Sequence, residues 1–386
     1  MSTRLPDSLK VSAMRRAAIV VLAIGLGGCA WWPWSSSRPK IPDPPPITAK
    51  ASASLAWSVS LGGAGVNFQP MLAGDSLWVA ARDGTVARID PATGAVRWRV
   101  KLEQPLIAGA GSDGETVVVA GRDGSLIALD GAGNRRWSSP AGAEVVTVPS
   151  VALGLAIVRT SDNRVSAFEL DSGKRRWSFV RQSPPLVLRQ TSGIAIDASS
   201  AYVGLPGGRL VALTLDSGAL RWEAAVSIPR GANEIERIAD VVGMPLVGGR
   251  EVCAATFQGR IGCFDAASGR TLWARDLSSP SGFDMDSELV VSADDRGDVH
   301  AFSRRGASVW RQDGLRGREL AAPLLLPHVV AIGDQSGLVH ALQRDDGRVA
   351  ARLTTDGSPI VAAPVAAGGL AVVQTSGGGL YAFRID

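Results

Sequence analysis

The stretch Asp171-Ser-Gly-Lys-Arg-Arg-Trp177 is the unit from which the rest of the chain is built. Variants of this unit place tryptophan at positions 57, 98, 137, 177, 222, 273 and 310, and an eighth copy ends in Ala351. Successive positions lie 37 to 41 residues apart, except for two consecutive steps of 45 and 51 residues. Self-similarity with a period near 40 residues predicts a repeat architecture.

A second recurring segment precedes the tryptophan units and has the form of a β-hairpin. An apolar run such as Ser76–Ala81 leads through a tight turn into an alternating segment such as Asp83–Asp90, a pattern that predicts two antiparallel strands. The tryptophan strand follows, and an innermost strand such as Val146–Val151 completes four. Four short strands, repeated eight times, predict an all-β fold: an eight-bladed β-propeller of four-stranded antiparallel blades.

The two ends of the repeat region predict how the ring closes. The chain enters with a single tryptophan strand, Leu55–Leu61, and leaves with three strands that lack one, ending at Tyr381–Asp386. Pairing the N-terminal strand with the C-terminal blade would remove two open sheet edges. We therefore expect the first strand to belong to the last blade.

We interpret the repeated tryptophans as packing residues, with a stack that grips a planar ligand as the alternative. A small residue recurs on the neighbouring strand, at positions 128, 167, 212, 301, 341 and 382, and leaves room for a flat indole. A buried indole also needs a partner for its ring N–H, which we expect it to find locally.

Residues 1–28 have the pattern of a lipoprotein signal peptide. A basic start at Met14-Arg-Arg16 precedes the apolar segment Ala17–Gly28, which is too short to span a bilayer as a helix. Leu26-Gly-Gly-Cys29 resembles the bacterial lipobox, which implies cleavage before Cys29 and attachment of acyl chains such as palmitate to its thiol. Ala30, in place of Asp, implies the outer membrane rather than the inner one, with the protein facing the periplasm.

An ordinary signal peptide with a chance cysteine is the alternative, and either Met1 or Met14 could start translation. Residues 29–53, rich in proline and serine, are expected to form a flexible tether without a core, and residues 54–386 the propeller. The net charge of +4 falls close to zero without residues 1–28, which contain four Lys/Arg and one Asp. Because no basic run is interleaved with aromatic residues, we expect no nucleic-acid partner.

The two long steps predict enlarged loops on adjacent blades. The extra residues lie around 182–189 and 229–243, and insertions in repeat proteins concentrate on loops, often on the binding face. Both follow the tryptophan strand of their blade, so both should project from the same side of the ring. Apolar anchors beside charged residues on exposed loops suit a protein interface; drift in loop length is the alternative. The expected interface residues are Leu186, Leu188, Arg189, Glu236, Arg237 and Asp240, with Ile235 and Ile238 as further apolar contacts.

Cys253 and Cys263 flank the hairpin turn Phe257-Gln-Gly259. A three-residue loop would place the two cysteines opposite each other, whereas a two-residue loop would place them on opposite faces of the hairpin. Export to an oxidising compartment permits a disulfide, but each cysteine also fits a small buried position. Both alternatives, a disulfide and two free buried thiols, remain open at this point.

No pattern in the sequence predicts catalysis. His300 and His340 occupy the same repeat position in adjacent blades, without a Cys or His at metal-ligand spacing. The sequence has no Gly-x-Ser-x-Gly elbow and no phosphate-binding glycine loop before a helix. We therefore expect no metal, no cofactor and no enzymatic activity.

The repeat Ala-x-Asp-x-x-Ser/Thr-Gly-x-x-x-Trp resembles the blade motif of quinoprotein (PQQ-type) propellers and covers nearly all of residues 54–386. Together with the lipobox, the segments Leu186-Val-Leu-Arg189 and Asn233-Glu-Ile-Glu-Arg-Ile-Ala-Asp240 resemble the BamB family, propeller lipoproteins of the outer-membrane β-barrel assembly machinery. This resemblance implies a non-catalytic scaffold that binds the periplasmic POTRA domains of BamA, the barrel-inserting subunit. It also implies assistance in the folding and insertion of β-barrel proteins, with nascent outer-membrane proteins as a further candidate partner.

The family's partner contacts carry over to Leu186, Leu188, Arg189 and Asp240, whereas its second aspartate falls on Val242, so half of the acidic contact is missing. Two alternatives belong to other classes. One is a PQQ-dependent periplasmic dehydrogenase, although we find no residues that match the calcium ligands and quinone clamp of such enzymes. The other is an envelope lipoprotein that binds another partner or a glycan.

Overall fold

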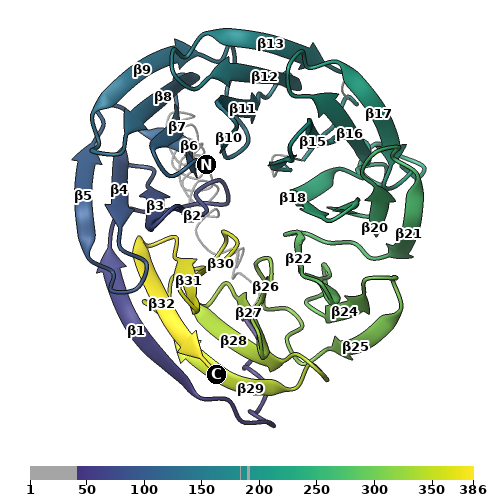
Figure 1. Cartoon of the computed structure of the whole chain (residues 1–386). Helices are drawn as coiled ribbons and strands as arrows, with labels where there is room; N and C mark the ends of the chain where they lie inside the picture. The colour runs from purple at the N-terminus through teal and green to yellow at the C-terminus, as the bar shows by residue number, and fades with distance from the viewer. Residues whose placement is uncertain (1–40, 183, 189–191) are drawn as a thin grey trace, which may run out of the picture. The chain divides into compact units, whose positions relative to one another are not determined.

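The computed structural model of the protein describes residues 41–182, 184–188 and 192–386. In this part of the chain, residues Pro42–Asp386 form one compact unit with eight four-stranded antiparallel sheets. Figure 1 shows the sheets arranged radially as the blades of a closed ring. The predicted eight-bladed β-propeller is confirmed.

In blades 1 to 7 the chain runs from the innermost strand to the outermost strand. Blades 1 and 2 consist of β2 (Met71–Ala73), β3 (Ser76–Ala80), β4 (Thr85–Ile89) and β5 (Val96–Lys101), then β6 (Leu106–Ser112), β7 (Thr116–Gly121), β8 (Ser125–Asp130) and β9 (Arg135–Pro140). Blades 3 and 4 consist of β10 (Ser150–Ala152), β11 (Leu155–Arg159), β12 (Arg164–Glu169) and β13 (Arg175–Val180), then β14 (Ile194–Ile196), β15 (Ser200–Leu205), β16 (Arg209–Thr214) and β17 (Leu220–Ala225).

The second half of the ring repeats this order. Blades 5 and 6 consist of β18 (Val241–Gly248), β19 (Glu251–Thr256), β20 (Arg260–Asp265) and β21 (Thr271–Asp276), then β22 (Phe283–Met285), β23 (Leu289–Ala293), β24 (Val299–Ser303) and β25 (Ser308–Gln312). Blades 7 and 8 consist of β26 (Leu324–Leu325), β27 (Val329–Gly333), β28 (Leu338–Gln343) and β29 (Val349–Thr354), then β30 (Val365–Ala367), β31 (Leu370–Gln374), β32 (Gly379–Ile385) and β1 (Ala53–Ser60).

The ring closes as the sequence predicts. Strand β1 pairs antiparallel with β32, in a register that runs from Ala53 opposite Ile385 to Ser60 opposite Gly379. One expected strand differs: the innermost strand of blade 3 covers only Ser150–Ala152 and not Val146–Val151. Pro149, which has no N–H to donate to a ladder, immediately precedes the observed strand.

The polar residues of the repeat shape its turns. At the Asp-x-x-Thr-Gly turn of blade 1, Asp90 Oδ1 accepts hydrogen bonds from the main-chain N–H groups of Ala92 and Thr93, both at 3.0 Å. Gly94 completes this turn with a φ of 75°, in the left-handed region that favours glycine. Sequence and backbone therefore agree on why Asp and Gly recur at these positions.

The repeated tryptophans join neighbouring blades. Among the described residues, seven indole N–H groups each donate to a main-chain carbonyl of the next blade, over 2.6 to 3.0 Å and 31 to 44 residues of sequence. The packing role is confirmed, but the expectation of a local N–H partner is wrong, because the indole reaches across the blade junction instead.

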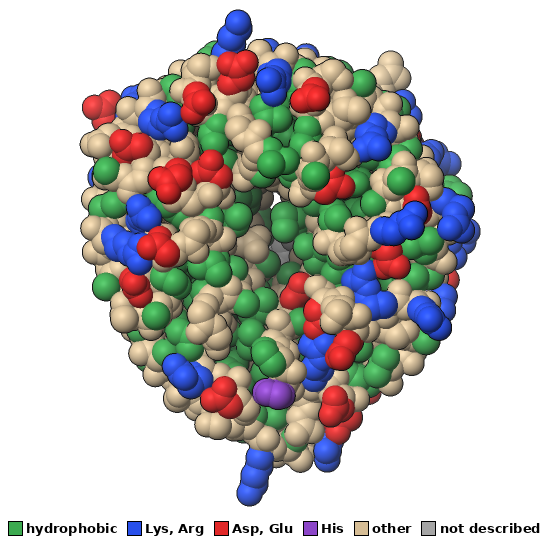
Figure 2. Space-filling model, in the orientation of Figure 1, with side chains coloured by type: hydrophobic (Ala, Val, Ile, Leu, Met, Phe, Trp, Pro, Cys, Tyr) green, Lys and Arg blue, Asp and Glu red, His purple; other side chains and the backbone are tan. Residues whose placement is uncertain are grey.

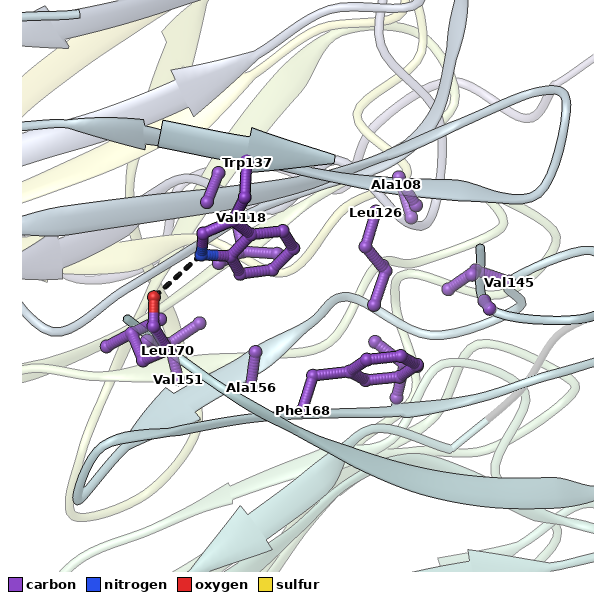
Figure 3. Close-up of a cluster of buried hydrophobic side chains, with 13 residues drawn as sticks. Ala108, Val118, Leu126, Trp137, Val145, Val151, Ala156, Phe168 and Leu170 are labelled. Carbon is purple, nitrogen blue, oxygen red and sulfur yellow. Dashed lines mark hydrogen bonds between the residues drawn. The ribbon is translucent and has the colours of Figure 1, made fainter. Parts of the chain in front are cut away.

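The turn glycine of the next blade receives each indole ring. A Cβ atom added at these seven glycines would lie 2.4 to 3.1 Å from the nearest ring carbon. Figure 3 shows one such junction, where Trp137 of blade 2 donates to Leu170 O of blade 3 at 2.7 Å. Beside this bond, Val118 and Leu126 of blade 2 pack with Phe168 of blade 3 in one buried cluster. The core in the described part of the chain is thus a series of eight clusters, each of which spans a blade junction.

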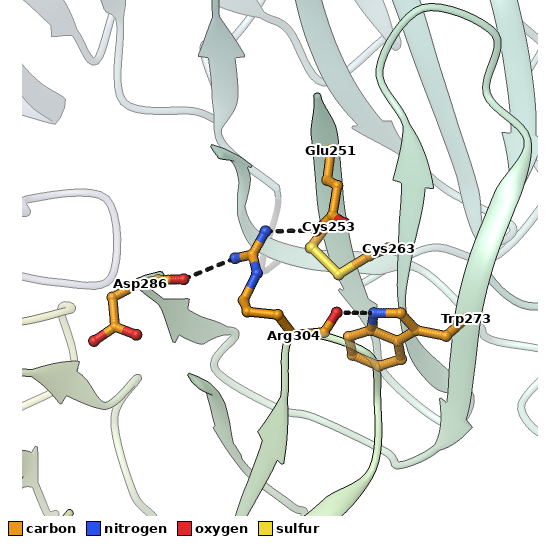
Figure 4. Close-up of a disulfide and its surroundings, with 6 residues drawn as sticks. All are labelled: Glu251, Cys253, Cys263, Trp273, Asp286 and Arg304. Carbon is orange, nitrogen blue, oxygen red and sulfur yellow. Dashed lines mark hydrogen bonds and ion pairs between the residues drawn. A yellow bond between two sulfur atoms is a disulfide. The ribbon is translucent and has the colours of Figure 1, made fainter. Parts of the chain in front are cut away.

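Of the two alternatives for the cysteines, the structure contains the disulfide. The register places Cys253 opposite Cys263 across a three-residue loop, with the two Cα atoms 4.0 Å apart. Both cysteines are fully buried in blade 5, in the same cluster as Trp273 (Figure 4).

The N-terminal boundary of the propeller differs from the expectation. Residues 42–52 do not remain free of the core: Thr48 and Ala49 donate main-chain hydrogen bonds to Val349 O, and Ser52 and Asp386 exchange two more. The compact unit accordingly begins at Pro42 rather than at residue 54. The signal peptide of residues 1–28 and Cys29 lie outside the described residues. Nowhere in the described part is there a helix that is both long and apolar enough to cross a membrane.

Deletion of residues 54–61 is expected to destabilise the whole propeller, because it exposes β32 and opens the ring. Thermal unfolding of the purified protein should show a melting temperature lowered by many degrees or a loss of the cooperative transition. An unchanged melting temperature would exclude this closure.

Replacement of Trp137 by Phe removes the bond to Leu170 O while retaining most of the ring, and should lower the free energy of unfolding by about 1–3 kcal/mol. Trp137→Ala also leaves a cavity where the indole ring packs, and should lower the free energy of unfolding by about 3–5 kcal/mol. Urea unfolding measures both values. The control is Leu153→Ala, at a 64% exposed side chain, which should change stability by no more than about 0.5 kcal/mol.

Candidate functional site

The connections between consecutive blades lie on one face of the ring. Because the four strands of a blade alternate in direction, the link from an outermost strand to the next innermost strand emerges beside the turn between the second and third strands. We call this side the crossover face. The two enlarged connections, the first crossover (residues 181–193, entering blade 4) and the second crossover (residues 226–240, entering blade 5), both belong to it.

The first crossover presents apolar side chains to solvent. Leu186 is 41% exposed and Val187 is 38% exposed, whereas Leu188 is half-buried. Arg189 lies outside the described residues. Val187 was not among the expected interface residues, because alternation along an irregular loop does not predict which side chains face outward.

The second crossover also carries exposed apolar residues, on a turn with its own hydrogen bonds. Ile228 is 67% exposed and Ile235 is 66% exposed. The Glu236 carboxylate accepts bonds from the main-chain N–H of Ala232 at 2.7 Å and from Asn233 Nδ2 at 2.9 Å. Glu236 is therefore held within its own loop, although it stays solvent-exposed.

Arg237 likewise has partners inside the second crossover. Its Nε donates to Gly231 O at 3.1 Å, and its Nη1 lies 3.5 Å from Glu234 Oε1. The guanidinium remains half-exposed, so it can still meet an acidic partner. Ile238 is half-buried rather than at the tip of the loop.

Asp240 joins the two crossovers. Its carboxylate accepts hydrogen bonds from Leu188 N at 2.7 Å and from Gly207 N at 2.9 Å, across 52 and 33 residues of sequence. The residue is 4% exposed. The expectation that Asp240 lies on an exposed charged rim is therefore wrong, because both carboxylate oxygens are used to hold main-chain N–H groups.

A buried arginine, which the sequence did not single out, accompanies this aspartate. Arg159, at the end of β11, is 3% exposed and donates from Nη1 to Asn163 Oδ1 at 3.2 Å. Burial lowers the pKa of Arg159 to about 10, and the negative charge of Asp240 opposes this shift. The guanidinium retains its proton at neutral pH and so supplies a positive charge near the Asp240 carboxylate.

A main-chain bridge also joins the end of the first crossover to the start of blade 5. Ser192 and Gly243 form a parallel bridge, and Gly193 N donates to Gly243 O at 2.9 Å. Val242, the position at which the second acidic contact is missing, is 1% exposed and pairs with Ala255 inside blade 5. A side chain at this position faces the protein interior and not a partner.

Charged residues border a shallow hollow of about 370 Å³ at the base of the first crossover. Arg181 and Arg209 both approach Glu223, with N–O distances of 2.9 and 3.7 Å. Their side chains are about half-exposed. The site thus combines apolar anchors on its loops with a polar border, as protein interfaces do.

The central cavity has a different character. Residues of the inner strands and the segments before them enclose about 570 Å³, with the apolar side chains Val66, Met71, Met244 and Leu324 among them. Hydrophobic side chains also surround the central opening on the face seen in Figure 2. This cavity brings together none of the residues expected at the interface.

Two clusters of potential metal ligands occur in the described chain, and internal partners already engage both. The sulfur atoms beside Glu251 are joined in the disulfide. In the other cluster, Asp298 binds Arg311 and Arg316, and His300 Nε2 lies 3.0 Å from Asp294 Oδ2. His340 repeats the last contact with Asp334 at 2.8 Å, so the two histidines share one structural role in adjacent blades.

Comparison with known proteins identifies similar chains. The family described as outer membrane protein assembly factor BamB matches residues 82–312 and 295–386. A relative from Burkholderia pseudomallei, named outer membrane protein assembly factor BamB, is 44% identical over 331 residues, which is 85% of this chain and 87% of the relative.

Two solved structures share the architecture. The crystal structure of BamB from Moraxella catarrhalis superposes with a TM-score of 0.79 at 26% identity, over 86% of this chain and all of that chain. A quinohemoprotein alcohol dehydrogenase from Comamonas testosteroni superposes with a TM-score of 0.66 at 17% identity, over 86% of this chain and 76% of the enzyme. The second likeness extends to the fold alone.

Replacement of Asp240 by Asn should loosen both crossovers, because the amide nitrogen cannot accept the bond that one carboxylate oxygen now accepts. We expect the free energy of unfolding to fall by about 1–3 kcal/mol and the Leu188 amide to exchange faster with solvent. Urea unfolding and hydrogen exchange measure these effects. Asp216→Asn, at an exposed turn of blade 4, is the control and should leave both quantities unchanged; equal effects of the two changes would contradict the bridging role.

Proposed function

Because the chain belongs to the BamB family of outer membrane protein assembly factors, we propose that it is a lipid-anchored scaffold that binds the periplasmic POTRA region of BamA. In this role it would assist the folding and insertion of β-barrel proteins. An outer-membrane-associated location follows from the family; attachment through Cys29 and orientation toward the periplasm are part of the proposal.

One observation carries the proposal: the two enlarged crossovers lie next to each other on one face and are bonded to each other through Asp240. Four apolar side chains are exposed on these loops, namely Leu186, Val187, Ile228 and Ile235. Exposed apolar residues within a polar border mark protein-binding sites more often than scattered single residues do. We call these four residues the docking patch.

The charged residues of the loops divide into two roles in this proposal. Arg237 is half-exposed at the border and is available to a partner. Asp240 and Glu236 act as positioning residues, because they hold the loops from within. Leu188 is half-buried and its main-chain N–H donates to Asp240, so its replacement would affect loop position as well as contact.

The lipid anchor rests on the sequence. Cleavage before Cys29 would place acylated Cys29 at the end of the tether, and several acyl chains on one residue hold a protein stably at a bilayer. The dehydrogenase alternative has only the shared fold in its favour, since the enzyme with a solved structure is 17% identical and the relatives at high coverage are named assembly factors.

The combined change Leu186→Glu and Ile235→Glu should weaken binding to a purified BamA POTRA fragment at least about 30-fold, because interface anchors typically contribute about 2 kcal/mol or more. Surface plasmon resonance or calorimetry measures the dissociation constant. Leu153→Glu is the matched control: Leu153 is 64% exposed, but it lies on a turn between β10 and β11, on the opposite face.

The control variant should bind like the unmodified protein, and both variants should melt like it. Undiminished binding of the double variant, or an equal loss for Leu153→Glu, would contradict the docking patch.

A further inference from the structure

The ring has one junction without a tryptophan. At the junction from blade 7 to blade 8, position 351 is alanine. The outermost strand of blade 8 is β1, so no repeat turn with its glycine precedes it. The main-chain carbonyl and the glycine that receive an indole elsewhere are therefore both missing from this junction, and other residues must hold it.

The segment of residues 42–49 occupies the outer edge of blade 7. The guanidinium of Arg318 donates from Nη1 to Pro42 O, and Arg352 donates from Nη2 to Pro45 O. Farther along, Thr48 N and Ala49 N donate to Val349 O at 2.9 and 3.0 Å. Ala51 and Ala53 then pack against the cluster that contains Ala351.

These contacts follow the length of β29. Arg318 lies in the crossover that enters blade 7, and Arg352 lies in the middle of β29. Val349 is the first residue of β29 and lies on the face opposite the crossovers. The segment therefore runs from the crossover face to the opposite face, where the chain turns into β1.

A buried network holds the two arginines. Arg318 is 3% exposed and donates from Nε to Asp334 Oδ2 at 2.7 Å, while Asp334 is fully buried. His340 Nε2 lies 2.8 Å from the same carboxylate, and Arg352 Nε lies 3.4 Å from His340 Nδ1. Burial by itself would raise the pKa of Asp334, but hydrogen bonds from His340, Ser336 and the main-chain N–H of Leu338 keep it below its usual value.

This network is built to accept carbonyl oxygens. The Arg318 guanidinium is held by the Asp334 carboxylate and the Arg352 guanidinium by His340, and each still has N–H donors for outside acceptors. An extended proline-rich segment offers main-chain carbonyls without competing internal hydrogen bonds. Gly314 and Gly317 lie under Pro45 and Pro42, where an added Cβ would come within 3.2 Å of each proline ring.

We propose that the edge of blade 7 is a docking site for residues 42–49 and that this segment replaces the missing eighth tryptophan contact. Arg318, Asp334, His340 and Arg352 form the site, which we call the tether cradle. When residues 42–49 are docked, the chain reaches the propeller on the crossover face, which also carries the docking patch.

A shorter free tether follows if Cys29 is lipidated, which rests on the proposed function. With the cradle occupied, about 13 residues separate Cys29 from the propeller, and they reach at most roughly 45 Å. With the cradle empty, about 24 residues would reach roughly 80 Å. The cradle thus restricts how far the docking patch can move from the membrane.

Hydrogen exchange of the mature full-length protein tests this site, with peptides that cover residues 42–50 as the readout. Four of these residues are proline and carry no amide hydrogen, so the amides of Thr48 and Ala49, which donate to Val349 O, report docking. In the unmodified protein these two amides should exchange at least about tenfold more slowly than in a free peptide of the same sequence. Arg352→Ala should raise their exchange about tenfold or more, because it removes a charged donor. Arg348→Ala, at an exposed arginine near the start of β29 that contacts Asp346, should leave exchange unchanged.

A second variant guards against a general loss of stability. Gly314→Leu leaves the network intact but places a side chain where Pro45 now packs, and its φ is not in the left-handed region, so it should also raise exchange in residues 42–50. Both variants should bind the BamA fragment like the unmodified protein, which separates this result from that of the docking patch. Free-peptide exchange in the unmodified protein, or unchanged exchange in both variants, would overturn the proposal.

Discussion

The contact between a tryptophan and the next blade is the interaction on which the rest of the structure depends. The strand ladders join only strands of the same blade. The ring therefore needs other contacts that hold neighbouring blades together. Each described tryptophan of the repeat makes two contacts across a junction. Its N–H donates to a main-chain carbonyl, and its ring packs on a turn glycine. Glycine is favoured there because an added Cβ atom would lie only 2.4 to 3.1 Å from the indole and because φ is in the left-handed region. The indole ring thus supplies buried packing area, and its N–H bond fixes the orientation of one blade on the next. The same contact repeats from blade to blade.

A ring held in this way determines where its irregular parts lie. The two enlarged crossovers enter adjacent blades on one face. Asp240, at the end of the second crossover, accepts hydrogen bonds from Leu188 of the first crossover and from Gly207 of blade 4. Because the Asp240 carboxylate holds the main-chain N–H groups of Leu188 and Gly207, the loops that carry the docking patch are fixed to the ring. Blades joined at every junction, with two enlarged loops fixed on one face, suit a scaffold, which presents a surface rather than changing shape.

The sequence predicts the periodic features well and the irregular ones poorly. The blade number, the closure of the ring by β1 and the position of the small residues opposite the tryptophans all follow from a regular spacing. The partner of each indole N–H does not, because the residue that accepts the bond lies in the next repeat and offers only its main chain. The burial of Asp240 and Arg159 and the docking of residues 42–49 depend on single contacts between distant segments, for which no repeated pattern exists.

The most direct measurement is a hydrogen-exchange footprint of the full-length protein with and without a purified BamA POTRA fragment. Binding through the docking patch should slow exchange in residues 184–188 and 228–238, with no change in the turn around Leu153 on the opposite face. Protection confined to the opposite face or to the outer strands of the ring, with both crossovers unchanged, would contradict it.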